Sequence, residues 1–422
     1  MQHWKIKLSL FLNYFVFAQL LNSVGTVILL VQKSFSIGES AASVLEPFKD
    51  MSIAIVSFLV TSFITRIGYK KAMLIALGVV SIICFVMPFT NSLVMVELLF
   101  ASIGSGFALI KMSVYGAIGL ITKNEKEHLG LMSYTESCFG IGIVAGYFTF
   151  PLFIDSSNPA SVSWLNVYFL LGALSLIALL LLWISPLDES EAQSNAAENR
   201  IDFAAMFKLM GQRAVVVFLV CAFIYVLLEQ SIMSWLPTFN NSVLKLSEIL
   251  SIRMASILAG SIAVGRLLAG FVLQKLKWIY VLMGCIIIAG ILVLVSMPII
   301  KNFQATYTGN GIDKLSDVPL VAFIFPLIGL VLAPIYPALN SVILSTLPKP
   351  KHGFMAGLII VFSAIGGSLG SVITGKVFQQ YDGSTAFYFS IIPMALLLIA
   401  MVTFNKLQQK DVVSGNMKSV GH

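Results

Sequence analysis

Five ionisable side chains lie within stretches that are otherwise apolar. They are Lys111, Glu136, Glu229, Arg253 and Arg266. A charge at the centre of a membrane-spanning helix costs about 2.5–3.5 kcal/mol on insertion scales, so it is expected to face a partner, water or a ligand. No Walker loop, nucleophilic triad or Cys/His metal spacing accompanies these residues. They predict binding and proton exchange rather than covalent chemistry, and we expect no enzyme, cofactor or metal site.

Lys111 lies on a stripe of small and polar residues at helical spacing. The stripe comprises Glu97, Ala101, Gly104, Ala108, Lys111, Tyr115 and Gly119. At 1.5 Å per residue, Lys111 is about 6 Å and Glu136 about 9 Å to the cytoplasmic side of the centres of consecutive spans. We therefore expect a Lys111–Glu136 pair. It is either structural, or one in which a ligand or proton competes for one member; a third possibility is a lysine that extends to the membrane interface.

Glu229 is the strongest candidate for a proton carrier. It lies near the middle of a span, one turn after Tyr225, and a carboxyl group in an apolar site can exchange protons near neutral pH. The alternatives are a structural pair with Arg253, in the outer part of the next span, or a hydrogen bond to a ligand. For Arg266, near the cytoplasmic end of that span, we expect a role in an inner gate or in loop packing.

A further pair of acids opens the second span in the segment EPFKD. Glu46 and Asp50 are one helical turn apart on one face. They predict either an entrance or gate at the outer surface, or an ordinary solvated helix cap.

The composition is that of a polytopic membrane protein. Of the 422 residues, 58% are hydrophobic and 11% are charged, whereas soluble domains carry about 25% charged residues. The net charge of +7 comes from short basic clusters between apolar runs. Such clusters orient a membrane protein, so we expect a lipid bilayer and no nucleic acid as partner.

Twelve apolar segments are long enough to cross a bilayer, which takes about 20 helical residues. They cover residues 8–31, 43–65, 71–90, 93–121, 130–154, 164–185, 214–239, 247–274, 278–300, 318–347, 353–380 and 384–405. The fold class is thus an all-α membrane protein, with twelve transmembrane helices in two pseudo-symmetric six-helix bundles.

Four regions follow from this pattern. They are an N-terminal bundle (1–185), a cytoplasmic linker (186–213), a C-terminal bundle (214–405) and a cytoplasmic tail (406–422). The linker ends in a short amphipathic piece (Ile201, Ala204, Phe207, Met210), which either lies on the inner membrane surface or is part of a flexible tether. Lysine and arginine are concentrated in the linker, the tail and alternate loops, which predicts that both termini are cytoplasmic.

The two halves resemble each other in sequence. HLGLMSYTESCFGIGIVAG aligns with HGFMAGLIIVFSAIGGSLG, so that His128, Gly142 and Gly146 match His352, Gly366 and Gly370. Parallel six-helix repeats are typical of transporters with a midplane site, although glycines also serve generic close packing.

The loop after the second span, with RIGYKK at its end, resembles the signature of the major facilitator superfamily. Arg66, Gly68, Lys70 and Lys71 match it and would act at a gate, whereas the signature acid is Thr65 here. LLEQSIMSWLPTF, GSIAVGRLLAG and GLVLAPIYPALNSVIL are more specifically similar to the fucose–galactose–glucose:proton symporter family. The chain departs from the sugar-carrying members in span 1, which has no acid, and in span 4, which has KMSVYG.

This resemblance implies a proton-coupled secondary transporter that moves a small polar solute by alternating access, located as a monomer in the bacterial inner (plasma) membrane. In relatives, spans 1, 4, 7 and 10 line the cavity, which implies ligand-binding roles for Gln19, Asn22, Thr26, Lys111, Tyr115, Tyr336 and Asn340. Arg253 of span 8 is a further ligand-binding candidate, as a possible counter-charge. Each of the uncharged residues can instead join helices by hydrogen bonds. Pro334 and Pro337 are expected to break or kink span 10.

Other cargoes and functions stay open. Lys111 and Arg253 could serve as counter-charges for an anionic metabolite or a siderophore-like compound, and export of amphipathic compounds is a further alternative. A different class of function is a membrane sensor that transports nothing.

Overall fold

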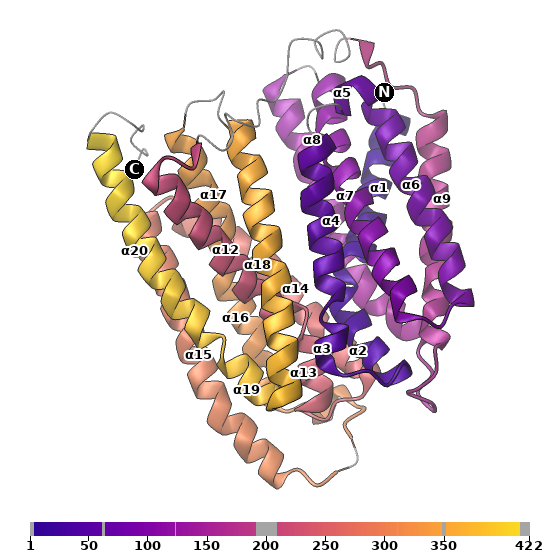
Figure 1. Ribbon diagram of the computed structural model, residues 1–422, viewed down its shortest axis with the longest axis vertical. Helices are drawn as coiled ribbons and strands as arrows, with labels where there is room; N and C mark the ends of the chain where they lie inside the picture. Colours follow the sequence, from indigo (N-terminus) through magenta and orange to yellow (C-terminus); the bar gives the residue numbers. More distant parts are fainter. Residues whose placement is uncertain are drawn as a thin grey trace. The chain divides into compact units, whose positions relative to one another are not determined.

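The computed structural model describes residues 4–60, 64–122, 124–190, 209–309, 311–347 and 352–413. These residues form an all-α protein, in which an isolated parallel bridge joins Leu246 to Ile312. The chain divides into two compact units (Figure 1). Unit 1 comprises Met1–Ile37 and Phe48–Ile201, and unit 2 comprises Gly38–Pro47 and Asp202–His422.

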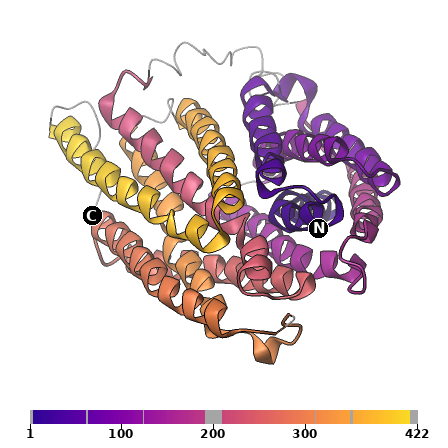
Figure 2. The ribbon, with the colours of Figure 1, turned by 60° about the horizontal axis from the view of Figure 1, so that its bottom comes forward.

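Unit 1 is built around its first helix. Its helices are α1 (Trp4–Asn22), α2 (Val24–Ser34), α4 (Leu45–Val60, whose first turn belongs to unit 2), α5 (Ile64–Ile67), α6 (Tyr69–Val86), α7 (Leu93–Ile121), α8 (Glu125–Thr149) and α9 (Val167–Ile184), with 3-10 turns at Met87–Phe89, Phe150–Phe153 and Ser163–Asn166. Helix α1 packs against α7, α8 and α9, and α6 packs against α7 and α9. Figure 2 views α1 nearly end-on, with other helices of unit 1 around it.

Unit 2 contains most of the second half of the chain. Its helices are α3 (Glu39–Ala42), α12 (Arg213–Met233), α13 (Leu236–Ser242), α14 (Glu248–Val272), α15 (Trp278–Thr306), α16 (Ile324–Leu332), α17 (Ile335–Thr346), α18 (His352–Gln380), α19 (Gly383–Tyr388) and α20 (Ile391–Val413), with 3-10 turns at Leu315–Asp317 and Leu320–Phe323. Helix α12 packs against α18 and α20, and α14 and α15 pack against α16.

The predicted membrane architecture is confirmed. In the described ranges, ten helical segments are long and apolar enough to cross a bilayer, and α1 with α2 makes an eleventh that bends by 43°. The remaining predicted span, 43–65, contains α4 and α5 and includes residues outside the described ranges. The chain is thus a multi-pass, all-α membrane protein.

Two spans are interrupted near their polar residues. Span 1 breaks at Ser23, between α1 and α2. Span 10 breaks where α16 ends at Leu332 and α17 begins at Ile335, after Pro334 as N-cap. The predicted break at Pro334 is therefore confirmed, because a proline ring cannot continue the hydrogen-bond ladder of a helix.

The linker lies largely outside the described ranges, as do Ile201, Ala204 and Phe207 of its predicted amphipathic piece. The first residues after span 6, up to Ser190, are described and contact unit 1.

One pair of the repeated glycines, Gly142 and Gly366, has the same role in both units. A side chain at Gly142 in α8 would overlap the backbone carbonyl of Phe15 in α1, and one at Gly366 in α18 would overlap that of Phe223 in α12. The sequence repeat thus marks one helix–helix contact, α1 with α8 and α12 with α18, that forms in each unit.

Candidate functional site

Unit 2 places the carboxylate of Glu229 beside a stacked pair of tyrosines. The Tyr225 hydroxyl donates to Glu229 Oε1 at 2.9 Å. The Tyr225 ring stacks on that of Tyr336, with centroids 5.7 Å apart, and the Tyr336 hydroxyl bonds Ser363 Oγ at 3.0 Å. Glu229 also borders a small pocket whose other walls include Ile232, Leu258 and Leu332. The acid is therefore held by one hydroxyl in mainly apolar surroundings.

The charge that acts on Glu229 is Arg266 rather than Arg253. Arg266 interacts electrostatically with both Glu229 and Tyr225. Arg253 lies on the exposed surface of α14, where its carbonyl accepts from Ser256 Oγ at 2.7 Å. The predicted structural pair of Glu229 with Arg253 is thus absent among the described residues, because Arg266, nearly four turns further along α14, is the arginine that lies near the acid.

Asn340 contributes an unsatisfied acceptor to this region. Its side chain interacts with the Tyr336 hydroxyl, while its buried Oδ1 has no hydrogen-bond partner among the described residues. A buried acceptor without a partner is costly. Tyr336 and Asn340 therefore lie together, as predicted from their spacing, and offer a free acceptor to a ligand or to water.

Unit 1 brings Lys111, Tyr115 and Glu136 together, but not as the expected ion pair. The Tyr115 hydroxyl donates to Glu136 Oε1 at 2.6 Å, and Lys111 Nζ lies 5.8 Å from the centroid of the Phe107 ring. Lys111 and Glu136 interact electrostatically, yet these two described residues form no direct salt bridge. The neighbouring aromatic side chains hold the two charges instead.

The polar residues of span 1 border a second small pocket in unit 1. Gln19, Asn22 and Thr26 line it together with Gly146 of α8. Gln19 Oε1 accepts from Thr149 Oγ1 at 3.3 Å, and Asn22 Nδ2 donates to Ala18 O at 2.9 Å. The predicted common face is present, next to the break at Ser23.

The interpretation of Glu46 and Asp50 as a solvated cap is wrong, because both side chains are buried. Glu46 has no exposed surface, and its Oε2 accepts from Ser234 Oγ at 2.7 Å within unit 2. Asp50 is 7% exposed and pairs with Lys49 at 3.4 Å in unit 1. Hydropathy alone carried no indication of these partners, since Ser234 is 188 residues away from Glu46 in sequence.

The signature loop fixes one end of unit 1, because its Lys70 and the segment after α9 cap each other's helices. Gly68 has φ 92°, a conformation that favours glycine, and it precedes α6. Lys70 N–H then donates to Glu189 Oε1 at 2.8 Å, while Lys70 Nζ donates to Trp183 O at 2.9 Å and Ser185 O at 2.7 Å. An acid thus caps the start of α6 and a cation caps the end of α9, as the helix dipoles favour.

Asp188, which precedes Glu189, is also fixed by local hydrogen bonds. The Ser190 hydroxyl and backbone N–H both donate to Asp188, and these bonds hold the pKa of the Asp188 carboxyl below its usual range. Sequence reasoning missed Glu189 as a partner of the loop, because no local pattern connects residues 119 positions apart. Arg66 and Lys71, which also match the signature, are exposed.

Replacing Lys70 by glutamine is expected to lower the stability of the protein by about 1 kcal/mol, because two carbonyl groups at the end of α9 lose a charged donor. Thermal denaturation of the purified protein in detergent measures this. Lys71→Gln is the matched control, since it removes the same charge from an exposed neighbour. Equal melting temperatures for the two variants would contradict the capping role of Lys70.

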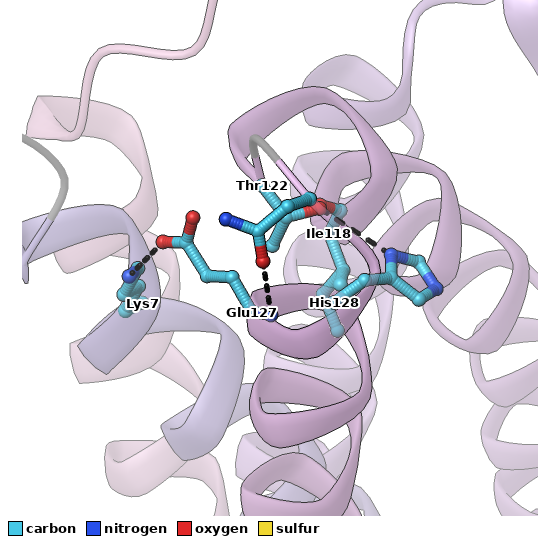
Figure 3. A network of polar contacts seen from close by, with 6 residues as sticks. Lys7, Ile118, Thr122, Glu127 and His128 are labelled. Carbon is cyan, nitrogen blue, oxygen red and sulfur yellow. Dashed lines mark hydrogen bonds and ion pairs between the residues drawn. The ribbon is translucent and has the colours of Figure 1, made fainter.

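A second polar network lies at the turn between α7 and α8, as Figure 3 shows. Thr122 Oγ1 donates its proton to Ile118 O at 2.7 Å, so the 3.3 Å contact with His128 requires that His128 Nδ1 donates. Lys7 pairs with Glu127 at 3.2 Å in the same network. In unit 2 the equivalent His352 donates Nε2–H to Leu347 O at 3.0 Å. Both histidines therefore bond the end of the preceding helix, which the sequence alignment of the halves did not predict.

No group of three or more His, Cys, Asp or Glu side chains that could hold a metal ion occurs in the described ranges.

Comparison with known proteins gives one family and many similar folds. Residues 10–371 match the family model described as Major Facilitator Superfamily. Three solved structures resemble the chain in fold. A bacterial homologue of the human lysosomal transporter Spinster, inward-facing and occupied, has a TM-score of 0.70 at 14% identity over 99% of this chain and 98% of that one. The nucleoside transporter NupG has a TM-score of 0.68 at 17% identity over 95% of this chain and 98% of that one.

The third is the xylose transporter XylE from E. coli in an inward-open conformation, with a TM-score of 0.69 at 14% identity over 95% of each chain. No curated protein sequence matches the chain.

Proposed function

This chain belongs to the Major Facilitator Superfamily, and we propose that it is a proton-coupled secondary transporter that moves a small polar solute by alternating access. A transporter of this family performs no covalent chemistry on its cargo. We propose that it is a monomer of the bacterial inner membrane. The lysine and arginine of its alternate loops support a cytoplasmic placement of both termini.

The observation that carries the proton coupling is the environment of Glu229. Its carboxylate accepts from Tyr225, borders a pocket with apolar walls and is attracted by Arg266. Uptake of a proton would remove the negative charge and with it the attraction to Arg266. Because α12 carries the acid and α14 carries the arginine, proton binding would weaken a tie between two helices of unit 2.

The solute proposal is supported by polar groups beside breaks in two spans. Gln19, Asn22 and Thr26 lie beside the break in span 1, and Tyr336 and Asn340 follow the break in span 10. Discontinuous helices are common at the binding sites of secondary transporters, because their free backbone groups can bind ligands. Two proteins of similar fold are named as a nucleoside transporter and a D-xylose-proton symporter, and both names refer to small polar solutes.

An anionic metabolite is the second candidate cargo. It is favoured by Lys111, a cation inside span 4 that forms no salt bridge with Glu136 or any other acid of the described residues. A monoanion bound to Lys111 would, however, be repelled by the negative charge of Glu136.

Proteoliposomes with an imposed pH gradient test the proposal. The purified full-length protein is expected to drive uptake of at least one of D-xylose, uridine, L-alanine, alanylalanine and succinate, each labelled. A protonophore is expected to abolish this accumulation, and a dye inside the vesicles is expected to record the accompanying proton movement.

Two outcomes would count against the proposal. Accumulation that is insensitive to the protonophore would remove proton coupling. Absence of flux for the whole panel, in both orientations of the gradient, would remove solute transport and favour a membrane sensor on the same fold.

A further inference from the structure

Lys111 and Glu136 form a pair of opposite charges that are close but not bonded to each other. They interact electrostatically, and both side chains are accessible, although they lie well inside spans 4 and 5. A charge in such a position requires a counter-charge, water or a ligand. Each of these two groups has hydrogen-bonding atoms left over that could bind a ligand.

The neighbours of the pair leave that capacity open. Tyr115 donates to Glu136 Oε1, and in the described part of the chain no donor reaches the other oxygen. Lys111 Nζ lies over Phe107, a contact that uses none of its three N–H donors. The ammonium group can therefore still bind an anion, and the carboxylate can still bind a cation.

Aromatic side chains from three helices pack on Phe107 and Tyr115, the residues that contact the pair. Tyr14 of α1 packs on Tyr115 and Phe139, with centroids 6.3 and 5.6 Å apart. Phe107 of α7 packs on Phe139 of α8 at 5.6 Å. These contacts tie the residues that hold Lys111 and Glu136 to one aromatic cluster within unit 1. One aromatic cluster thus supports both charged side chains and places apolar surface beside them.

We propose that Lys111 and Glu136 bind the two ends of a zwitterionic solute, Lys111 its carboxylate and Glu136 its ammonium group. Amino acids and short peptides are solutes of this class. The net charge of the two side chains is zero, so a zwitterion balances both charges, whereas a monoanion leaves Glu136 unpaired and a sugar leaves both without counter-charges. This assignment rests on the proposed function as a transporter and names the substrate class.

The test is binding of labelled probes to the full-length protein in detergent. The probes are glycine, β-alanine, 4-aminobutyrate, 6-aminohexanoate and alanylalanine, which vary the separation of the two charges. At least one is expected to bind. Lys111→Gln and Glu136→Gln are each expected to weaken its binding about tenfold or more, because each leaves one charge of the ligand without its partner.

Analogues with one charge assign the two ends. The N-acetyl form of the bound probe has lost its ammonium group, so Glu136→Gln is expected not to weaken its binding further. The amide form has lost its carboxylate, so Lys111→Gln is expected not to weaken its binding further. Lys301→Gln and Asp317→Asn, which remove exposed charges, are matched controls expected to bind the probes like the wild type.

The inference is overturned if none of the five zwitterions binds the wild-type protein. It is also overturned if a zwitterion that binds the wild type binds both single variants with the same affinity. Failure of the transporter proposal is distinguishable from this, since it would leave zwitterion binding in detergent intact but give no flux in proteoliposomes.

Discussion

Replacement of Glu229 by glutamine is expected to abolish proton-driven accumulation while preserving solute exchange across the membrane. A transporter that couples one proton to one neutral solute can accumulate it up to about tenfold per pH unit of gradient. Glutamine keeps the size of the side chain and can still bond Tyr225, but it does not titrate. Without coupling the expected concentration ratio is about one. Uptake into proteoliposomes measures this ratio, and counterflow with unlabelled solute measures exchange.

The two arginines of α14 provide the matched comparison. Arg266→Gln is expected to impair accumulation, because Arg266 is the charge that acts on Glu229. Arg253→Gln is expected to keep proton coupling, whatever its effect on solute affinity, because its side chain is exposed and does not act on the acid. Accumulation by Glu229→Gln at the wild-type ratio would show that the proton is carried elsewhere.

The membrane architecture could be predicted from sequence because a single physical requirement dominates it. Crossing a bilayer demands about 20 apolar helical residues, and span 4 was predicted at 93–121, where α7 is found. Span 9 was predicted to end near residue 300, yet α15 continues to Thr306. Its last turns are polar, so hydropathy no longer reports them while the backbone ladder continues.

Side-chain partners within the membrane were harder to predict, because several candidates share a depth. Helical rise placed Lys111 and Glu136 at similar levels, and the structure brings them into electrostatic range. The helical rise could not indicate that Tyr115, one turn after Lys111, would donate the hydrogen bond to the Glu136 carboxylate. That choice depends on rotamers and on how α7 and α8 are rotated about their axes.

The burial of Glu46 illustrates a different limit. From its neighbours in sequence, Glu46 resembled an acid in a solvated first turn, but its hydrogen-bond donor is Ser234. The segment Gly38–Pro47 belongs by its contacts to unit 2, although the helices before and after it belong largely to unit 1. Local pattern cannot report such an assignment, because it depends on contacts between distant parts of the chain.

Gly370→Ala is expected to lower stability strongly, whereas the equivalent change Gly146→Ala in the other repeat is expected to be tolerated. A Cβ at Gly370 would overlap the backbone carbonyl of Leu227, where α18 lies against α12. Backbone atoms cannot rotate away as a side chain can, so the helices must separate, at a cost of about 1–3 kcal/mol for overpacking. Thermal denaturation and the yield of monodisperse protein measure the loss.

Gly146 aligns with Gly370 in the repeat, yet a Cβ added at Gly146 would have more space. The nearest atom to a Cβ there is Gln19 Cα at 3.6 Å, an ordinary van der Waals contact. Alanine favours a helix over glycine by about 0.8–1.0 kcal/mol, so Gly146→Ala is expected to leave the melting temperature unchanged or slightly raised. Equal destabilisation of the two variants would mean that the close contact is shared by both repeats. The difference expected here instead follows from a wider spacing of α1 and α8 at Gly146, beside the pocket lined by Gln19, Asn22 and Thr26.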